Sequence, residues 1–104
     1  MASNRVEMLK SMVAQNPADA FARYGLAMEY KNAGDYDAAM REFRAVIAAN
    51  PDYHAAYFHG GQTLERMGLE DDARSMYREG VDAAARVGNA HARAEMQGAL
   101  DLLG

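Results

Sequence analysis

Apolar residues recur along this chain at steps of three and four, the spacing that places side chains on one face of an α-helix. The stripes comprise Leu26, Ala27 and Tyr30; Ala39, Phe43, Val46 and Ile47; Ala73, Tyr77 and Val81; and Ala92, Met96, Ala99 and Leu103. Nowhere does the sequence show the strict alternation of apolar and polar residues that indicates a half-buried strand. The pattern therefore predicts an all-α chain.

Residues that begin or end helices fall at regular places between these stripes. They form the pairs Asn16-Pro17, Gly34-Asp35, Asn50-Pro51, Gly68-Leu69 and Gly88-Asn89. Proline is tolerated in the first turn of a helix, and glycine just past a helix end accepts the left-handed backbone found there. Because links this short join antiparallel neighbours, the breaks predict about six antiparallel helices.

The second half of the chain nearly repeats the first. Pro17 and Pro51 lie 34 residues apart and each follows an asparagine, and Gly34 returns at the same offset as Gly68. A fixed period of this length is typical of a stack of helical hairpins, in which each hairpin buries its apolar face against its neighbours.

The sequence resembles the tetratricopeptide repeat, whose pattern sets Leu-Gly and Tyr on one helix, Ala and Phe on the next, and a closing Pro. The first copy matches through Leu26, Ala27, Tyr30, Gly34, Asp35, Tyr36, Ala39, Phe43 and Pro51. The second copy fits at Tyr57, Gly61, Leu64, Gly68, Ala73 and Tyr77. It departs where Gly60 replaces the leucine and Ala85 the proline. In the first copy Arg23 stands at the tryptophan position, so that packing site is either rebuilt or partly exposed.

The resemblance implies one domain over residues 1–104, built as a tetratricopeptide-type helical hairpin stack. Its repeats span residues 18–51 and 52–87. Residues 3–15 look like the second helix of a preceding repeat, and residues 89–103 like the first helix of a third repeat or a capping helix. Such folds present surfaces for binding and seldom carry out chemistry, so the resemblance implies a non-catalytic protein–protein interaction module.

In this family the first helix of each hairpin lines a concave groove, and the corresponding strip is unusually aromatic in this chain. The candidate groove residues are Phe21, Tyr24, Met28, Asn32, Phe58, His59, Gln62, Arg66, His91 and Glu95. Aromatic residues, methionine and arginine are enriched where protein partners bind. Internal packing of the aromatics, on one another or on the last helix, is the alternative and stays open at this stage.

Some members of the family bind the C-terminal carboxylate of a peptide with Lys, Asn and Arg on these helices. At the corresponding places this chain has Tyr24, Met28, His59, His91 and Glu95. Because Glu95 would repel a carboxylate, we expect a partner protein or peptide with apolar anchors and some basic character, one possible mode being a helix in the groove. The alternative is structural self-association into a homo-oligomer through the groove or the end helices.

Composition narrows the classes of partner further. Lys and Arg number 11 and Asp and Glu 15, a formal charge of −4, whereas nucleic-acid binding calls for a basic face. The absence of cysteine excludes disulfides and thiolate metal sites. No apolar run resembles a signal peptide or approaches the ~20 residues of a membrane span. We therefore expect no membrane association and a cytoplasmic location.

Three histidines invite a metal or catalytic interpretation. His54 and His59 are five residues apart and diverge by about 140° around a helix. His91 and Glu95 share a face, but two ligands do not close a metal site. If His59 and His91 converge across the groove, a metal-dependent or enzymatic role is a remote alternative. With no nucleophile elbow or phosphate loop, the sequence predicts no enzyme, no metal and no cofactor.

Overall fold

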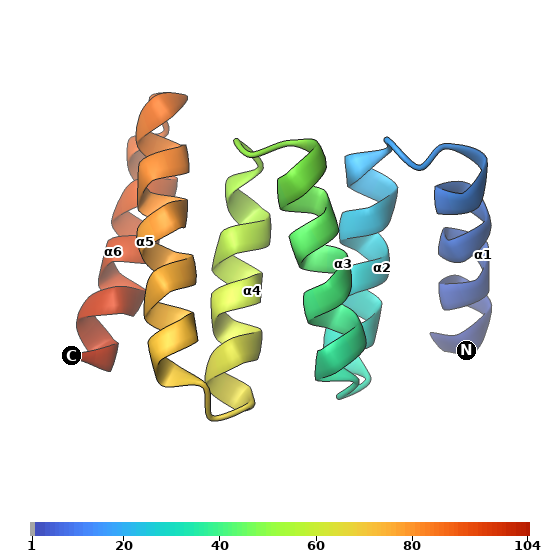
Figure 1. Cartoon of the computed structure of the whole chain (residues 1–104), viewed down its shortest axis with the longest axis horizontal. Helices are drawn as coiled ribbons and strands as arrows, with labels where there is room; N and C mark the ends of the chain where they lie inside the picture. The colour runs from blue at the N-terminus through green and yellow to red at the C-terminus, as the bar shows by residue number, and fades with distance from the viewer. Residues whose placement is uncertain (1) are drawn as a thin grey trace.

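The computed structural model describes residues 2–104 and consists, over that range, of six α-helices stacked in chain order (Figure 1). The helices are α1 (Ala2–Gln15), α2 (Ala20–Asn32), α3 (Tyr36–Ala49), α4 (His54–Arg66), α5 (Glu70–Arg86) and α6 (Ala90–Leu103). The prediction of an all-α stack of hairpins is confirmed. No helix within residues 2–104 combines the length and the apolar character that crossing a bilayer requires.

Side-chain caps and glycines set the limits of these helices. Asp19, Asp35 and Asn89 each accept a hydrogen bond from the backbone N–H three residues later, at 3.1, 3.3 and 3.0 Å. Each such cap is worth about 1 kcal/mol. After α2 and α4, Gly34 and Gly68 have φ angles of 82° and 78°, which glycine adopts without strain. The breaks that the sequence predicted are therefore helix boundaries.

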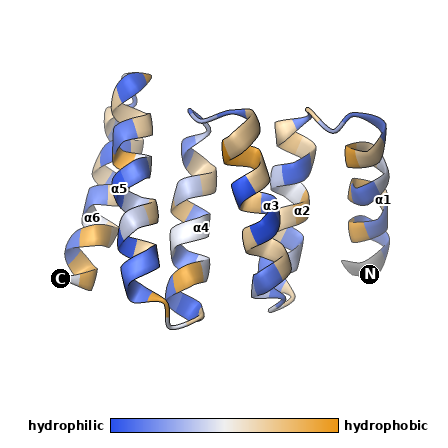
Figure 2. Ribbon diagram, viewed as in Figure 1, coloured by the Kyte–Doolittle hydropathy of each residue, from blue (hydrophilic) through white to orange (hydrophobic). Residues whose placement is uncertain are grey.

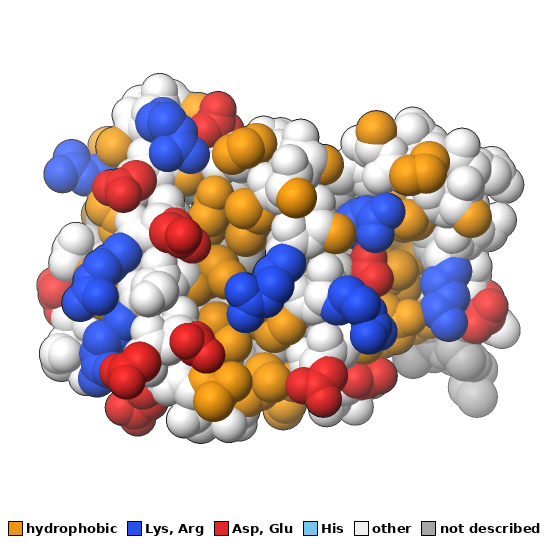
Figure 3. Space-filling model, in the orientation of Figure 1, with side chains coloured by type: hydrophobic (Ala, Val, Ile, Leu, Met, Phe, Trp, Pro, Cys, Tyr) orange, Lys and Arg blue, Asp and Glu red, His pale blue; other side chains and the backbone are white. Residues whose placement is uncertain are grey.

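Every helix carries both hydrophobic and hydrophilic residues (Figure 2). The hydrophobic residues pack against neighbouring helices, so the core lies between successive helices. Small residues allow the helices to approach closely: Ala27, Ala39 and Ala73 have no exposed surface. Gly61 lies directly against the fully buried ring of Tyr77, where an added Cβ would be 2.6 Å from Cζ of the tyrosine. On the face that Figure 3 shows, side chains of both charges are interspersed with apolar ones.

Methionines complete the packing of the looser second repeat. A Cβ on Gly60 would lie 3.6 Å from Cγ of Met76 and 3.7 Å from Cε of Met40, and both methionines are buried. One on Gly80 would collide with the sulfur of Met96. Flexible thioether side chains suit irregular gaps. The space that the missing leucine would fill is therefore occupied by methionines from α3 and α5.

Arg23 rebuilds the packing site that the repeat pattern assigns to tryptophan. Its guanidinium donates hydrogen bonds to the Glu42 carboxylate at 3.0 Å and to the carbonyl oxygen of Pro17 at 3.3 Å. Both charged side chains are mostly buried. An ion pair between α2 and α3, tied to the loop before α2, thus takes the place of an aromatic ring.

Candidate functional site

The first helices of successive hairpins form one continuous inner face. α2 contacts α4, and α4 in turn contacts α6. The candidate groove residues all come from these three helices. The structure therefore places them on three helices that contact one another in turn, and it gives them very different environments.

Tyr24 is part of the packing between helices rather than an open contact. Its ring centroid lies 6.1 Å from that of Phe43, 5.2 Å from that of Tyr53 and 6.0 Å from that of His59. Burial and the neighbouring Tyr53 raise the pKa of the Tyr24 phenol. Met28, one turn further along α2, is also half-buried against the core. Both side chains therefore pack against the core, next to the inner face.

The other two aromatic candidates are open to different degrees. Phe21, at the start of α2, is 75% exposed. Phe58 is half-buried: its ring meets that of His59 edge-on at 5.4 Å and lies 6.3 Å from that of Tyr77. Phe21 therefore lies on the surface, whereas Tyr24 and Phe58 are both partly buried against the core.

A buried lysine lies at the contact between α2 and α4. Lys31 is only 7% exposed, and its Nζ lies 2.8 Å from Oε1 of Gln62 and 3.1 Å from Nδ1 of His59. No carboxylate forms an ion pair with it among the described side chains. Burial, and then the charge of Arg66, lower the pKa of Lys31. Burial and the charge of Lys31 likewise lower the pKa of His59.

The two histidines singled out for a metal have separate surroundings. The ammonium of Lys31 beside His59 opposes any cation there, whereas His91 is exposed and lies 3.8 Å from the Glu95 carboxylate. Among the residues that the structure describes, no group of three or more metal-ligating side chains comes together. Nothing in the arrangement favours the metal-dependent alternative.

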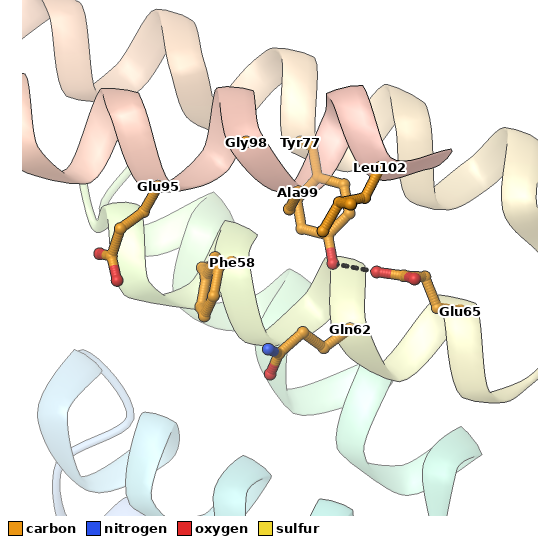
Figure 4. A pocket seen from close by; sticks show the side chains of 8 residues that line it. All are labelled: Phe58, Gln62, Glu65, Tyr77, Glu95, Gly98, Ala99 and Leu102. Atoms are coloured by element: carbon orange, nitrogen blue, oxygen red, sulfur yellow. Dashed lines mark hydrogen bonds between the residues drawn. The ribbon is translucent and has the colours of Figure 1, made fainter. Parts of the chain in front are cut away.

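A cavity of about 400 Å³ lies between α4 and α6 with Tyr77 of α5 at its back (Figure 4). Its lining residues are Phe58, Gln62, Glu65, Tyr77, Glu95, Gly98, Ala99 and Leu102. Glu95 lies at one end and Glu65 at the other, with Phe58 and Gln62 between them. We call this cavity the α4–α6 pocket.

Tyr77, at the back of the α4–α6 pocket, holds one of the two carboxylates of the pocket in place. The hydroxyl of Tyr77 donates a hydrogen bond to the carboxylate of Glu65. Burial and this carboxylate raise the pKa of the Tyr77 phenol, so the hydroxyl keeps its proton at neutral pH. A smaller cavity of about 160 Å³ adjoins on the other side of Phe58 and reaches His59 and Glu95.

The structure brings together only some of the predicted groove residues. Phe58, Gln62 and Glu95 line the α4–α6 pocket together, and His59 lines the adjoining cavity. The exposed candidates outside both cavities are Phe21, Asn32, Arg66 and His91.

Sequence reasoning missed Lys31 and Glu65, which occupy equivalent positions 34 residues apart. Both lie three residues beyond a predicted groove residue, Met28 and Gln62 respectively. The predicted stripe continued to the residues four positions on, Asn32 and Arg66, and including the neighbours three positions on as well would have found them.

Comparison with known proteins agrees with this arrangement. A family model described as the tetratricopeptide repeat matches residues 6–59 and again residues 30–100. The chain belongs to the tetratricopeptide repeat family. A tetratricopeptide repeat-containing protein of Pseudomonas aeruginosa is 30% identical over 91 residues, which cover 88% of this chain and 87% of that protein.

Solved structures share the same stack. A tetratricopeptide repeat domain protein from Salinibacter ruber superposes with a TM-score of 0.75 and 32% identity over 82% of this chain and 94% of that chain. A protein from Bordetella parapertussis gives a TM-score of 0.81 and 31% identity over 94% of this chain and 85% of that chain. The tetratricopeptide repeat is a protein–protein interaction fold, and partners of that kind are the expected ones for this chain.

Proposed function

We propose that this chain is a non-catalytic module that binds a peptide or helical segment of a partner protein on the inner face of α2, α4 and α6. The observation that carries the proposal is the α4–α6 pocket. Its volume of about 400 Å³ lies in the range of ligand sites, about 300–1,000 Å³. Its lining combines apolar side chains with a few polar groups, as binding pockets generally do.

Exposed apolar side chains on the same face supply anchors for such a segment. Leu102, at the edge of the pocket, is 91% exposed, and Phe21 at the opposite end of the face is 75% exposed. Covering such side chains on binding gains roughly 25 cal/mol for each Å² of apolar surface removed from water. A segment lying across α2, α4 and α6 would cover both, together with the exposed part of Phe58.

Selection from a random peptide library displayed on phage, with the immobilised chain as bait, tests this proposal and does not require the partner to be identified. Selected peptides are then titrated calorimetrically against wild type, Phe58→Ala and Leu102→Gln. We expect both variants to weaken binding by about tenfold or more, the usual effect of truncating a central contact. Unchanged affinity in both variants would overturn the assignment of the inner face.

A matched control comes from the other end of the stack. Met8 on α1 is an exposed apolar side chain, 55% accessible, and α1 and α6 are the two outermost helices (Figure 1). Met8→Gln also replaces an exposed apolar side chain with a polar one, away from the α4–α6 pocket. Peptide affinity in this variant is expected to equal that of wild type.

Self-association is a second candidate, favoured by the exposed apolar residues of both end helices. Met8 and Met12 are exposed on α1, and Leu102 on α6. Apolar surface at the open end of a helical stack is commonly covered by a further repeat or another chain. Light scattering across a concentration series separates this role from peptide binding, because a chain that stays monomeric at every concentration excludes it.

A further inference from the structure

The α4–α6 pocket combines an apolar floor with negative charge at both ends. The side chains of Phe58 and Ala99 provide the floor, Leu102 provides an apolar edge, and the carboxylates of Glu65 and Glu95 lie at opposite ends (Figure 4). A purely apolar occupant would leave these carboxylates poorly solvated, and an acidic one would be repelled. The pocket therefore matches a side chain that has an apolar stem and a cationic head.

Glu65 is the better placed of the two carboxylates to receive a cation. The hydroxyl of Tyr77 holds it in position, but that bond uses only one of the roughly four lone-pair sites of a carboxylate. No lysine or arginine of the described chain forms an ion pair with it, whereas Glu95 lies 3.8 Å from His91.

Lys31, the cation buried among the described residues, makes its contacts away from Glu65. Lys31 donates to Gln62 and faces His59, and neither bond reaches Glu65. The inner face consequently changes sign along its length: it is positive where α2 meets α4 and negative where α4 meets α6. The carboxylates that line the α4–α6 pocket are therefore available to a cationic side chain of a partner.

We infer that the α4–α6 pocket accepts a lysine or arginine side chain of the partner segment. Its methylene stem lies on Phe58, Ala99 and Leu102, as long basic side chains lie on apolar surface elsewhere. Its cation pairs with the carboxylate of Glu65, and Glu95 adds negative potential at the other end. The inference rests on the proposed binding of a partner segment to the inner face, and it names the residue type that the segment must contain.

The test uses the phage-selected peptides and two variants of the pocket. We expect wild type to select lysine or arginine at one position of the peptide. Glu65→Gln should abolish that preference, because the glutamine oxygen still accepts the Tyr77 hydrogen bond while the charge is gone. Glu95→Gln should weaken the preference without removing it. Asp82→Asn, a matched loss of one exposed negative charge on α5, should leave it unchanged.

A thermodynamic cycle then measures the pairing directly. One selected peptide is compared with a version that has norleucine in place of lysine, which keeps the stem and removes the cation. Against wild type the norleucine peptide should bind about tenfold more weakly, in the range of well-placed charge pairs. Against Glu65→Gln the two peptides should bind equally. An equal norleucine effect in both proteins would overturn the pairing with Glu65.

Filling the pocket provides a variant that keeps every charge. A Cβ on Gly98 would meet no atom within 4 Å, so Gly98→Leu places a side chain in the pocket without a clash at its first carbon. It should remove the preference for lysine or arginine and leave the thermal midpoint of unfolding no lower than in wild type.

The outcomes separate this inference from the proposed function. Peptides whose binding depends on Phe58 and Leu102 but shows no preference for a basic residue would overturn the inference alone. A selection that yields no peptide dependent on Phe58 or Leu102 would overturn both.

Discussion

The ammonium of Lys31 lies 3.1 Å from Nδ1 of His59, and this contact determines which nitrogen of the imidazole carries the proton. An ammonium group has three donors and no acceptor. Nδ1 of His59 therefore accepts the hydrogen bond, the ring is neutral, and its proton is on Nε2. A protonated imidazole would have donors at both nitrogens and would face a like charge at this distance.

Replacing Lys31 with methionine should raise the pKa of His59. The variant removes a positive charge that disfavours the imidazolium and a donor that requires a neutral ring, while a side chain of similar length keeps the site filled. The pKa is measured by following the imidazole Cε1 proton during an NMR titration. Lys10→Met, on an exposed side chain of α1, should leave the pKa of His59 unchanged. A lower pKa in Lys31→Met would contradict the assigned contact.

The same contact makes the stability of the fold depend on pH. Burial and Lys31 hold the folded-state pKa of His59 below its ordinary value of 6.5. Between those two pKa values the unfolded chain binds more protons than the folded one, so the free energy of unfolding falls as the pH decreases below about 6.5. In His59→Gln this contribution is absent, and the loss of stability between pH 7 and pH 5 should be smaller. Urea unfolding at a series of pH values measures the difference, and equal slopes in the two proteins would contradict the expectation.

The placement of the helices followed from the sequence, whereas the surroundings of Lys31 did not. Caps such as Asp35 and the 34-residue period act locally, so short segments of sequence contain them. Lysine on an amphipathic helix normally extends into water. The burial of Lys31 depends instead on two residues of α4, His59 and Gln62, about 30 positions further along the chain. Only the packed structure brings these three side chains together.

The residues of the α4–α6 pocket could be predicted only in part from the sequence. The groove stripe identified Phe58, Gln62 and Glu95, because equivalent positions of successive repeats share one face. Tyr77 was assigned to the core, which is correct, but its ring also closes the back of the pocket. Its second role depends on the close approach of α4 and α5 at Gly61, which the apolar spacing does not specify.

Phe21 and Tyr24 should differ in their effect on stability, although both were predicted as groove contacts. Phe21 is 75% exposed, so Phe21→Ala should change the free energy of unfolding by less than about 0.5 kcal/mol. Tyr24 packs on three rings, and Tyr24→Ala should cost about 1–3 kcal/mol, less than truncation of a fully buried aromatic residue. Urea unfolding of both variants measures this. Similar losses in the two would show that Phe21 is also packed inside.

Adding one methyl group to Gly61 or to Gly98 should have opposite effects. Both glycines lie within helices, where alanine is favoured by about 1 kcal/mol when space is available. At Gly98 the space is open, so Gly98→Ala should raise the thermal midpoint. At Gly61 the new Cβ would lie 2.6 Å from Cζ of Tyr77, a fully buried ring whose hydroxyl is bonded to Glu65. The ring moves away only by disturbing that bond or the core.

We therefore expect Gly61→Ala to destabilise the fold by a net amount of about 1–3 kcal/mol, the usual cost of overpacking. Urea unfolding of the two variants gives the comparison, and stabilisation by Gly61→Ala would show that Tyr77 moves freely. Because Tyr77 forms the back of the α4–α6 pocket, a displaced ring should also weaken peptide binding in Gly61→Ala. In Gly98→Ala the methyl group projects into the pocket itself, so this variant should gain stability while losing part of its affinity. Loss of peptide affinity in both variants, with opposite changes in stability, would show that Gly98 lines the pocket directly and that Gly61 acts on it through the ring of Tyr77.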